Sequence, residues 1–217
     1  MQTRTKKLTV LAMLSALAYI VMVVGRIPVI MFLKYDPKDV IITIGGFLYG
    51  PLSAFTMSAV VSFVEMFTVS DTGLIGLVMN IIATCSFACT ASFIYKSKRT
   101  ITRAIIGLIA GWLLATAVML LWNYFITPIY MGLSREAVAE LLIPAFLPFN
   151  LLKGGLNAAI TMLLYKPIKK ALSKSHLMSV SEETAATAGK VNIGTKLVSF
   201  FIIITCILLI LVFQGHI

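Results

Sequence analysis

Seven apolar segments separated by short polar or basic stretches restrict the fold of this chain more than any other feature. Of the 217 residues, 59% are hydrophobic and 12% are charged, whereas a soluble domain carries about 25% charged residues. A single core of this size cannot bury so many apolar side chains, so the sequence predicts an all-α integral membrane protein. The segments run from about Leu8 to Gly25, Val40 to Tyr49, Leu52 to Val69, Leu74 to Tyr95, Ala104 to Ile126, Phe149 to Tyr165 and Leu197 to Phe213.

The second segment is too short to cross a bilayer as a straight helix. At about 1.5 Å per residue it spans roughly 15 Å, half of the hydrocarbon core. We expect it to extend into Lys34–Asp39 or to thin the membrane locally. The chain then divides into a six-span membrane body over residues 1–172, a flexible polar cytoplasmic linker over 173–196 and an additional C-terminal hydrophobic helix over 197–217.

Basic residues are distributed unevenly between the two sides of the predicted spans. With the N-terminus in the cytoplasm, thirteen Lys and Arg residues lie inside and four outside, which is the bias that membrane proteins show. The basic residues behind the formal net charge of +10 then serve to orient the chain in the membrane, and we expect no nucleic acid partner. The inside residues are Arg4, Lys6, Lys7, Lys96, Lys98, Arg99, Arg103, Lys166, Lys169, Lys170, Lys174, Lys190 and Lys196, and the outside ones are Arg26, Lys34, Lys38 and Arg135.

Polar residues inside the predicted spans converge on one depth. Counting residues from the ends of each span places Glu65, Asn80, Asn123, Asn150 and Lys153 in the outer third of the bilayer, on four different segments. Polar side chains inside a membrane usually face the bundle interior or a wet cavity. The sequence therefore predicts an outward-facing binding cavity.

One face of the sixth segment carries three of these polar groups. Asn150, Lys153 and Asn157 follow the i, i+3, i+7 spacing of a single helix face. Simpler explanations stay open: Lys153 could snorkel to the interface, Glu65 could snorkel or pair with Lys153, and each Asn could form only an interhelical hydrogen bond. Aromatic residues at the same depth, including Tyr124, fit either an interfacial belt or a stacking pocket.

Two further stretches have both a structural and a functional interpretation. Residues 32–39 form either a turn in which Asp39 caps the helix beginning at Val40, or a lid over the outer cavity. Ala12 and Ala16 on the first segment form a small-x-x-x-small pair, which allows close approach of another helix from the same bundle or from a partner.

Several motifs resemble those of the riboflavin-specific S components of energy-coupling factor (ECF) transporters. The most specific is Leu147-Pro-Phe-Asn-Leu-Leu-Lys-Gly154 at the start of the sixth segment. The resemblance covers about residues 8–170. The other motifs are Leu33-Lys-Tyr-Asp-Pro-Lys-Asp39, Gly45-Gly46-Phe47, Tyr49-Gly50-Pro51 and Trp122-Asn-Tyr124 followed by Thr127-Pro128 and Tyr130.

This resemblance implies a bacterial plasma-membrane subunit with a six-helix bundle of the S-component type. Such a subunit hydrolyses nothing, binds riboflavin as its transported ligand without a cofactor, and docks on a transmembrane coupling subunit driven by two cytoplasmic ATPases. The coupling subunit would contact Ala12 and Ala16, and the whole S component would topple to release the vitamin inside. The Leu197–Phe213 helix is a departure from the family pattern.

The resemblance also assigns roles to residues. Asn150 and Lys153 would hydrogen-bond the isoalloxazine ring, Asn123 would assist, and the loop over Lys34, Tyr35 and Asp36 would close over the ligand. With the residues placed by depth, the predicted ligand-binding set is Asn123, Asn150, Lys153, Lys34, Tyr35, Asp36, Asn80, Tyr124, Gly154, Asn157 and Glu65.

Three other functions compete with this one. An S component for thiamine or a pterin-like vitamin would have the same fold and different pocket chemistry. A membrane-embedded enzyme would need a catalytic constellation, but the two histidines, His176 and His216, lie outside the predicted body. A channel would need a continuous polar path, whereas the inner halves of the spans carry few ionisable groups.

Overall fold

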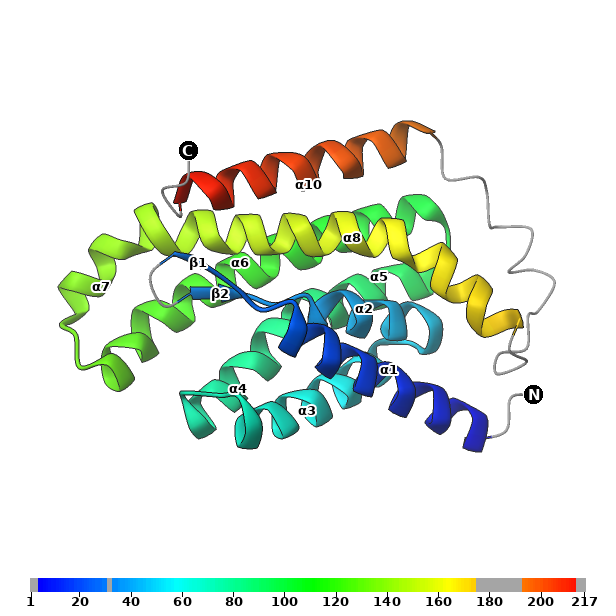
Figure 1. The fold of residues 1–217 in the computed structure, drawn as a ribbon, viewed down its shortest axis with the longest axis horizontal. Coiled ribbons are helices and arrows are strands. Elements are labelled where there is room, and N and C mark those ends of the chain that lie inside the picture. The colour runs from blue at the N-terminus through cyan, green and yellow to red at the C-terminus, as the bar shows by residue number, and fades with distance from the viewer. Residues whose placement is uncertain (1–3, 31–32, 175–192, 214–217) are drawn as a thin grey trace.

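Helices make up nearly all of this computed structural model, which describes residues 4–30, 33–174 and 193–213 (Figure 1). Two π-helical turns, η1 and η2, join helices end to end, so that α4, η1 and α5 form one continuous rod, as do α7, η2 and α8. The elements are α1 (Arg4–Val24), β1 (Ile27–Ile30), β2 (Leu33–Tyr35), α2 (Lys38–Tyr49), α3 (Pro51–Thr68), α4 (Gly73–Thr84), η1 (Cys85–Cys89), α5 (Thr90–Lys98), α6 (Ile101–Met131), α7 (Arg135–Leu141), η2 (Leu142–Phe146), α8 (Leu147–Lys174) and α10 (Ile193–Phe213).

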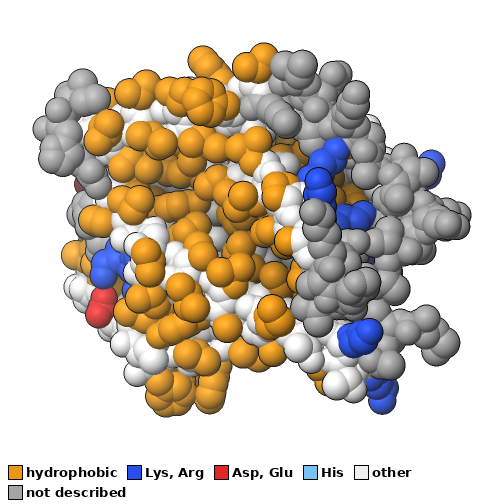
Figure 2. Space-filling model, turned by 45° about the vertical axis from the view of Figure 1, so that its right-hand side comes forward, with side chains coloured by type: hydrophobic (Ala, Val, Ile, Leu, Met, Phe, Trp, Pro, Cys, Tyr) orange, Lys and Arg blue, Asp and Glu red, His pale blue; other side chains and the backbone are white. Residues whose placement is uncertain are grey.

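Five helical rods in the described residues are long and apolar enough to cross a membrane, which confirms the predicted all-helical membrane fold. They are α1, α3, the α4–α5 rod, α6 and the α7–α8 rod. Apolar side chains cover the middle of the face in Figure 2, and charged side chains lie toward its left and right edges, with most of the basic ones on the right. This arrangement suits a bundle with lipid around its middle and water at its ends.

Helix α2 is the sixth helix of the body and lies at its centre. It has 12 residues, and every residue from Lys38 to Phe47 is buried. It packs against α1, α3 and α8, which explains why its sequence is apolar all round rather than on one face. A Cβ atom at Gly46 would lie 2.1 Å from Ser92 Oγ, so glycine is needed where α5 approaches α2 most closely.

A short antiparallel hairpin, β1–β2, connects α1 to α2. Ile27 pairs with Tyr35 and Ile30 with Leu33, with a register shift between Pro28 and Ile30. The sequence predicts a turn or a lid over residues 32–39, and strands β1 and β2 were not expected. Residues 31–32 lie outside the described part of the chain.

The C-terminal helix α10 runs beside α8, on the opposite side of the molecule from α1 and α3 (Figure 1). Its apolar stretch, Leu197–Val212, is shorter than the five spanning rods. Of the predicted linker over 173–196, the first two residues belong to α8 and the last four to α10. Residues 175–192 lie outside the described residues.

Candidate functional site

Lys153 lies between two carboxylates where α8 passes the start of α2. Its Nζ atom is 3.8 Å from Asp36 Oδ2 and 3.7 Å from Asp39 Oδ2. Asp36 directly follows β2, and Asp39 belongs to the first turn of α2. Both carboxylates are buried, so one ammonium group faces two negative charges that are shielded from solvent, which leaves this group of three side chains with a net charge of −1. Lys153 thus points into the protein rather than snorkelling to the interface.

Asp39 joins three helices through hydrogen bonds. It accepts from Thr84 Oγ1 of α4 at 2.7 Å and from Asn157 Nδ2 of α8 at 3.2 Å. Tyr35 donates to the other side-chain atom of that amide, Asn157 Oδ1, at 3.0 Å. The prediction that Asp39 caps the helix from Val40 is wrong, because α2 begins at Lys38 and the Asp39 carboxylate points to its neighbouring helices.

A second buried charge cluster lies on the other side of α2. Glu65 of α3 forms ion pairs with Lys38 and with Arg26, the latter at 2.6 Å. Arg26 also donates to the carbonyl of Val69 at 3.1 Å. The suggested pairing of Glu65 with Lys153 is therefore wrong. The hairpin turns the chain so that Arg26 and Lys38 face α3, and adjacent residues Lys38 and Asp39 point to opposite sides of α2.

The two clusters together are electrically neutral. Arg26, Lys38 and Lys153 provide three positive charges, and Asp36, Asp39 and Glu65 provide three negative ones. Burial by itself raises the pKa of Asp36, but the charges of Lys153, Lys38 and Arg26 outweigh it and hold that pKa below its ordinary value. Because the opposite charges are equal in number, the free-energy cost of burying them in a membrane protein is lower than for unpaired charges.

A cavity of about 60 Å³ borders the Lys153 cluster. Five predicted ligand-binding residues line it together, from α4 and α8: Asn80, Asn150, Lys153, Gly154 and Asn157. Five further lining residues were not in the predicted ligand-binding set: Asp39, Thr116, Met79, Phe87 and Met119. Since a water molecule takes about 30 Å³ and ligand sites have roughly 300–1,000 Å³, a ring-sized ligand must displace the surrounding groups.

The other predicted residues lie around this cavity or away from it. Tyr35 and Asp36 adjoin it through Asn157 and Lys153. Asn123 makes local bonds inside α6, donating to the carbonyl of Met119 at 2.8 Å and accepting from Thr127 at 3.0 Å.

The last two predicted ligand-binding residues, Tyr124 and Lys34, do not line this cavity. Tyr124 packs against Phe125 with ring centroids 5.0 Å apart. Lys34 is exposed and pairs with Asp71 at 3.2 Å.

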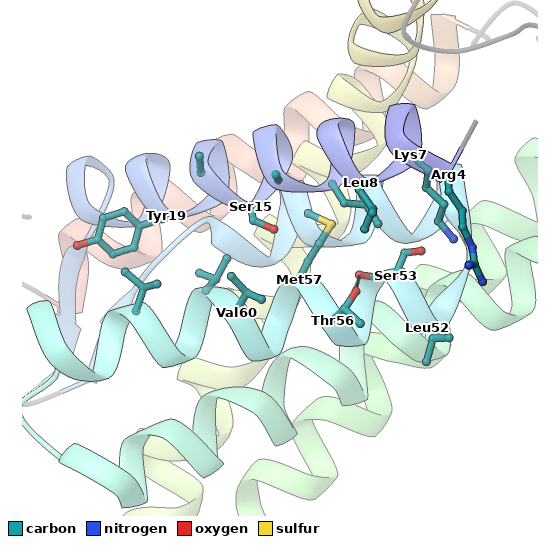
Figure 3. Close-up of a pocket in the computed structure, with 15 residues that line it drawn as sticks. Arg4, Lys7, Leu8, Ser15, Tyr19, Leu52, Ser53, Thr56, Met57 and Val60 are labelled. Atoms are coloured by element: carbon teal, nitrogen blue, oxygen red, sulfur yellow. Dashed lines mark hydrogen bonds between the residues drawn. The ribbon is translucent and has the colours of Figure 1, made fainter. Parts of the chain in front are cut away.

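A larger apolar groove of about 760 Å³ runs between α1 and α3 (Figure 3). Ala12, Ser15 and Ala16 line it from α1, facing Thr56 and Val60 of α3. Both alanines are exposed in this chain. The groove ends near Arg4 and Lys7 at one side and near Tyr19 at the other.

Comparisons with known proteins agree with this architecture. The chain is 29% identical over 180 residues to the riboflavin transporter RibU of Staphylococcus aureus (strain TCH60), covering 79% of this chain and 94% of that one. It is also 29% identical over 179 residues to the riboflavin transporter FmnP of Bacillus subtilis (strain 168), covering 76% and 93%.

A solved structure and a family description extend this agreement. The structure, described as that of the S component of a bacterial ECF transporter, superposes with a TM-score of 0.66 at 30% identity, covering 78% of this chain and 99% of the other. Residues 6–165 match the family described as "ECF transporter, substrate-specific component". The chain therefore belongs to the substrate-specific components of ECF transporters, multi-pass membrane proteins that bind a substrate for transport and are not enzymes.

Proposed function

We propose that this chain captures riboflavin from the outer side of a bacterial plasma membrane and delivers it inward as the S component of an ECF transporter. The observation that carries the proposal is the meeting of three amides and one ammonium group, Asn80, Asn150, Asn157 and Lys153, around one cavity. Relatives that are named riboflavin transporters, at 29% identity, support the same ligand.

The chemistry of the cavity suits the edge of a flavin ring. That edge alternates carbonyl acceptors with a ring N–H donor, and a side-chain amide provides both a donor and an acceptor. Lys153 adds donors, and its charge is already outweighed by those of Asp36 and Asp39, which favours a neutral ligand over an anionic one.

Apolar side chains complete the site for a flat ring. Met79, Phe87 and Met119 line the same cavity, and thioether and aromatic groups pack well against ring faces. Because the cavity is small, we expect the β1–β2 hairpin and the start of α2 to move when the ring enters.

Binding of purified protein in detergent tests this function. Riboflavin is added, and its binding is followed by the quenching of flavin fluorescence and by visible absorbance. Asn150→Ala is the site variant. Asn150 donates within its own helical rod, to the carbonyl of Phe146 at 2.7 Å, so the loss of this bond should lower the free energy of unfolding by only about 1 kcal/mol. Leu164→Ala, at a half-exposed position of the same helix, is the control.

The proposal expects tight binding by the wild type and by Leu164→Ala, and affinity reduced at least about tenfold in Asn150→Ala. Binding of thiamine or a pterin-like vitamin in place of riboflavin would keep the family assignment and overturn the ligand. Equal affinities of Asn150→Ala and Leu164→Ala would place the ligand elsewhere.

For transport we propose that the α1–α3 groove receives the transmembrane coupling subunit, which two cytoplasmic ATPases drive. The exposed Ala12 and Ala16 support this because they leave room for a partner helix to approach the backbone of α1. The positive-inside bias places Arg4 and Lys7, at one end of the groove, on the cytoplasmic side. Toppling of the whole subunit would then present the vitamin to the inside.

Copurification tests this docking face. Ala16→Trp fills the groove, whereas Met13→Trp places the same ring at another exposed position of α1. We expect Ala16→Trp to bind riboflavin normally but to lose the coupling subunit and uptake, while Met13→Trp keeps both. If Ala16→Trp forms the complex as well as the wild type does, the coupling subunit docks on another face and the proposed docking groove is wrong.

A further inference from the structure

Helix α10 lies beyond the family match, which ends at residue 165, yet it packs onto the body of the protein. Among the residues of α10 whose burial is described, Ser199, Cys206 and Ile210 are buried, and their spacing of seven and four residues defines one helical stripe. Phe201 and Ile207 on other sides are exposed. Helix α10 runs along α8 in Figure 1 and contacts it, and Cys206 and Ile210 belong to the same apolar cluster as Leu156 of α8.

The same stripe also reaches the hairpin. Cys206 and Ile210 form one apolar cluster with Val29 of β1 and with Tyr35 of β2. Phe149, Leu152 and Leu156 contribute the α8 side of this cluster. Three elements that are distant in the sequence, the hairpin, α8 and α10, therefore share one small core.

The hairpin needs such a support. Its strands have four and three residues, and an isolated two-stranded hairpin is at best marginally stable in water. In this chain its inner residues Val29 and Tyr35 are 3% and 5% exposed. Removing the α10 side of the cluster would uncover apolar surface of both residues and loosen the hairpin.

Tyr35 connects this core to the polar cavity. Its ring belongs to the apolar cluster, while its hydroxyl donates to Asn157 Oδ1 at 3.0 Å. Asn157 in turn donates to Asp39 and lines the cavity beside Lys153. A shift of the hairpin would therefore break a hydrogen bond to a residue of the candidate site.

We propose that α10 is a brace for the substrate site, in which Cys206 and Ile210 are positioning residues that hold the β1–β2 hairpin and the Tyr35–Asn157 bond in place. The brace slows the opening of the hairpin and hence the exchange of the bound ligand. The statement on ligand exchange rests on the proposed function, whereas the statement on the hairpin does not.

A cross-link first tests where α10 lies in the full-length protein. A Cβ atom added at Gly155 would be 3.9 Å from Cys206 Sγ and in ordinary contact with Trp112 at 3.5 Å, so Gly155→Cys brings two thiols within disulfide reach. A protease site inserted within residues 175–192 separates the two fragments after cleavage. We expect the two fragments of Gly155→Cys to stay joined on non-reducing gels. They should separate when Gly155→Cys is combined with Cys206→Ala. Absence of a cross-link in Gly155→Cys alone would overturn the proposal that α10 is a brace.

Hydrogen exchange then tests what α10 does. Ile210→Ala shortens a buried side chain of the stripe, and Ile207→Ala makes the same change at a residue that is 48% exposed. In the ligand-free protein we expect backbone amides of residues 27–35 to exchange at least about fivefold faster in Ile210→Ala than in the wild type. Equal exchange in Ile210→Ala and Ile207→Ala would overturn the proposal whether or not a ligand is known.

Riboflavin dissociation gives the functional readout on the same variants. We expect the dissociation rate constant to rise at least about fivefold in Ile210→Ala, with Ile207→Ala unchanged and with Ile210→Leu close to the wild type. If the wild type binds no riboflavin, the proposed ligand fails while the exchange result still decides the brace. Faster hairpin exchange with unchanged dissociation would restrict α10 to a structural role and refute its effect on the ligand.

Discussion

Lys38 of α2 and Glu65 of α3 form an ion pair in which both side chains are 1% exposed. Arg26 joins the same carboxylate from the end of the hairpin. The next residue after Lys38, Asp39, faces the opposite side of α2 and the candidate cavity. One turn of a short helix thus ties the hairpin and α3 together on one side and builds the ligand site on the other.

The first prediction concerns this ion pair. Glu65→Gln would leave the buried Lys38 without its carboxylate, and breaking a buried pair costs about 3–5 kcal/mol. We expect a large decrease in Tm, measured by thermal unfolding in detergent. The control is Asp71→Asn, which breaks the exposed Lys34–Asp71 pair and should cost less than about 1 kcal/mol. Similar decreases in the two variants would contradict the assignment.

The second prediction concerns pH. Because Lys153, Lys38 and Arg26 lower the pKa of Asp36 below its ordinary value, the unfolded chain takes up a proton at a higher pH than the folded one. The stability that Asp36 contributes is therefore complete above the ordinary carboxyl pKa of about 4. It is lost as the pH falls through the lower pKa of the folded state.

Lys153→Met makes this dependence visible. Removing Lys153 removes the strongest of the charges that lower the Asp36 pKa, so burial then acts with less opposition and the pKa rises. Tm measured between about pH 3 and pH 8 should fall less on the acid side in Lys153→Met than in the wild type, because the gap between the folded and unfolded pKa of Asp36 is narrower, and riboflavin binding should be lost. Parallel Tm curves for the two proteins would show that Lys153 does not control Asp36.

The third prediction separates the role of Tyr35 in the site from its role in the fold. Tyr35→Phe keeps the ring in the apolar cluster but leaves the buried Asn157 Oδ1 without its donor, a loss of about 1–3 kcal/mol. Tyr95→Phe removes a comparable bond, from Tyr95 to Tyr165 at 2.7 Å, two helical turns farther along α8. Titration with riboflavin should show weaker affinity only in Tyr35→Phe, although both variants lose stability; equal affinities would remove Tyr35 from the site.

Much of the fold could be predicted from the sequence because lipid imposes a simple rule on long apolar segments. The predicted ends of α1 and α3 lie within a few residues of the observed ones, whereas the α7–α8 rod over Arg135–Leu172 extends well beyond the predicted segment from Phe149 to Tyr165. Counting residues along these spans also placed Asn80, Asn150 and Lys153 at one depth, and they line one cavity. The rise of a helix per residue and the orientation of the chain are sufficient to place these residues at one depth.

The hairpin and the charge pairing could not be predicted in this way. Strands of four and three residues give a weak periodic signal, and Pro28 within β1 argues against a strand. Pairing depends on which side of a helix turn faces which neighbour, so the sequence could not exclude the two wrong alternatives, a cap by Asp39 and a pair of Glu65 with Lys153. The alternation of Lys38 and Asp39 at the start of a fully buried helix was the available signal.

The last prediction compares two neighbouring glycines on α8. A Cβ atom at Gly154 would lie 2.0 Å from Trp112 Cδ1, whereas one at Gly155 would meet that ring at 3.5 Å. Gly154→Ala should therefore push α8 away from α6 or turn the Trp112 ring, at a cost of about 1–3 kcal/mol, and distort the cavity that Gly154 lines. Gly155→Ala should be neutral or stabilising by up to about 1 kcal/mol, because alanine favours a helix interior. Thermal unfolding and riboflavin titration of both variants check this, and a Gly154→Ala protein as stable as Gly155→Ala would show that α6 and α8 are not in such close contact.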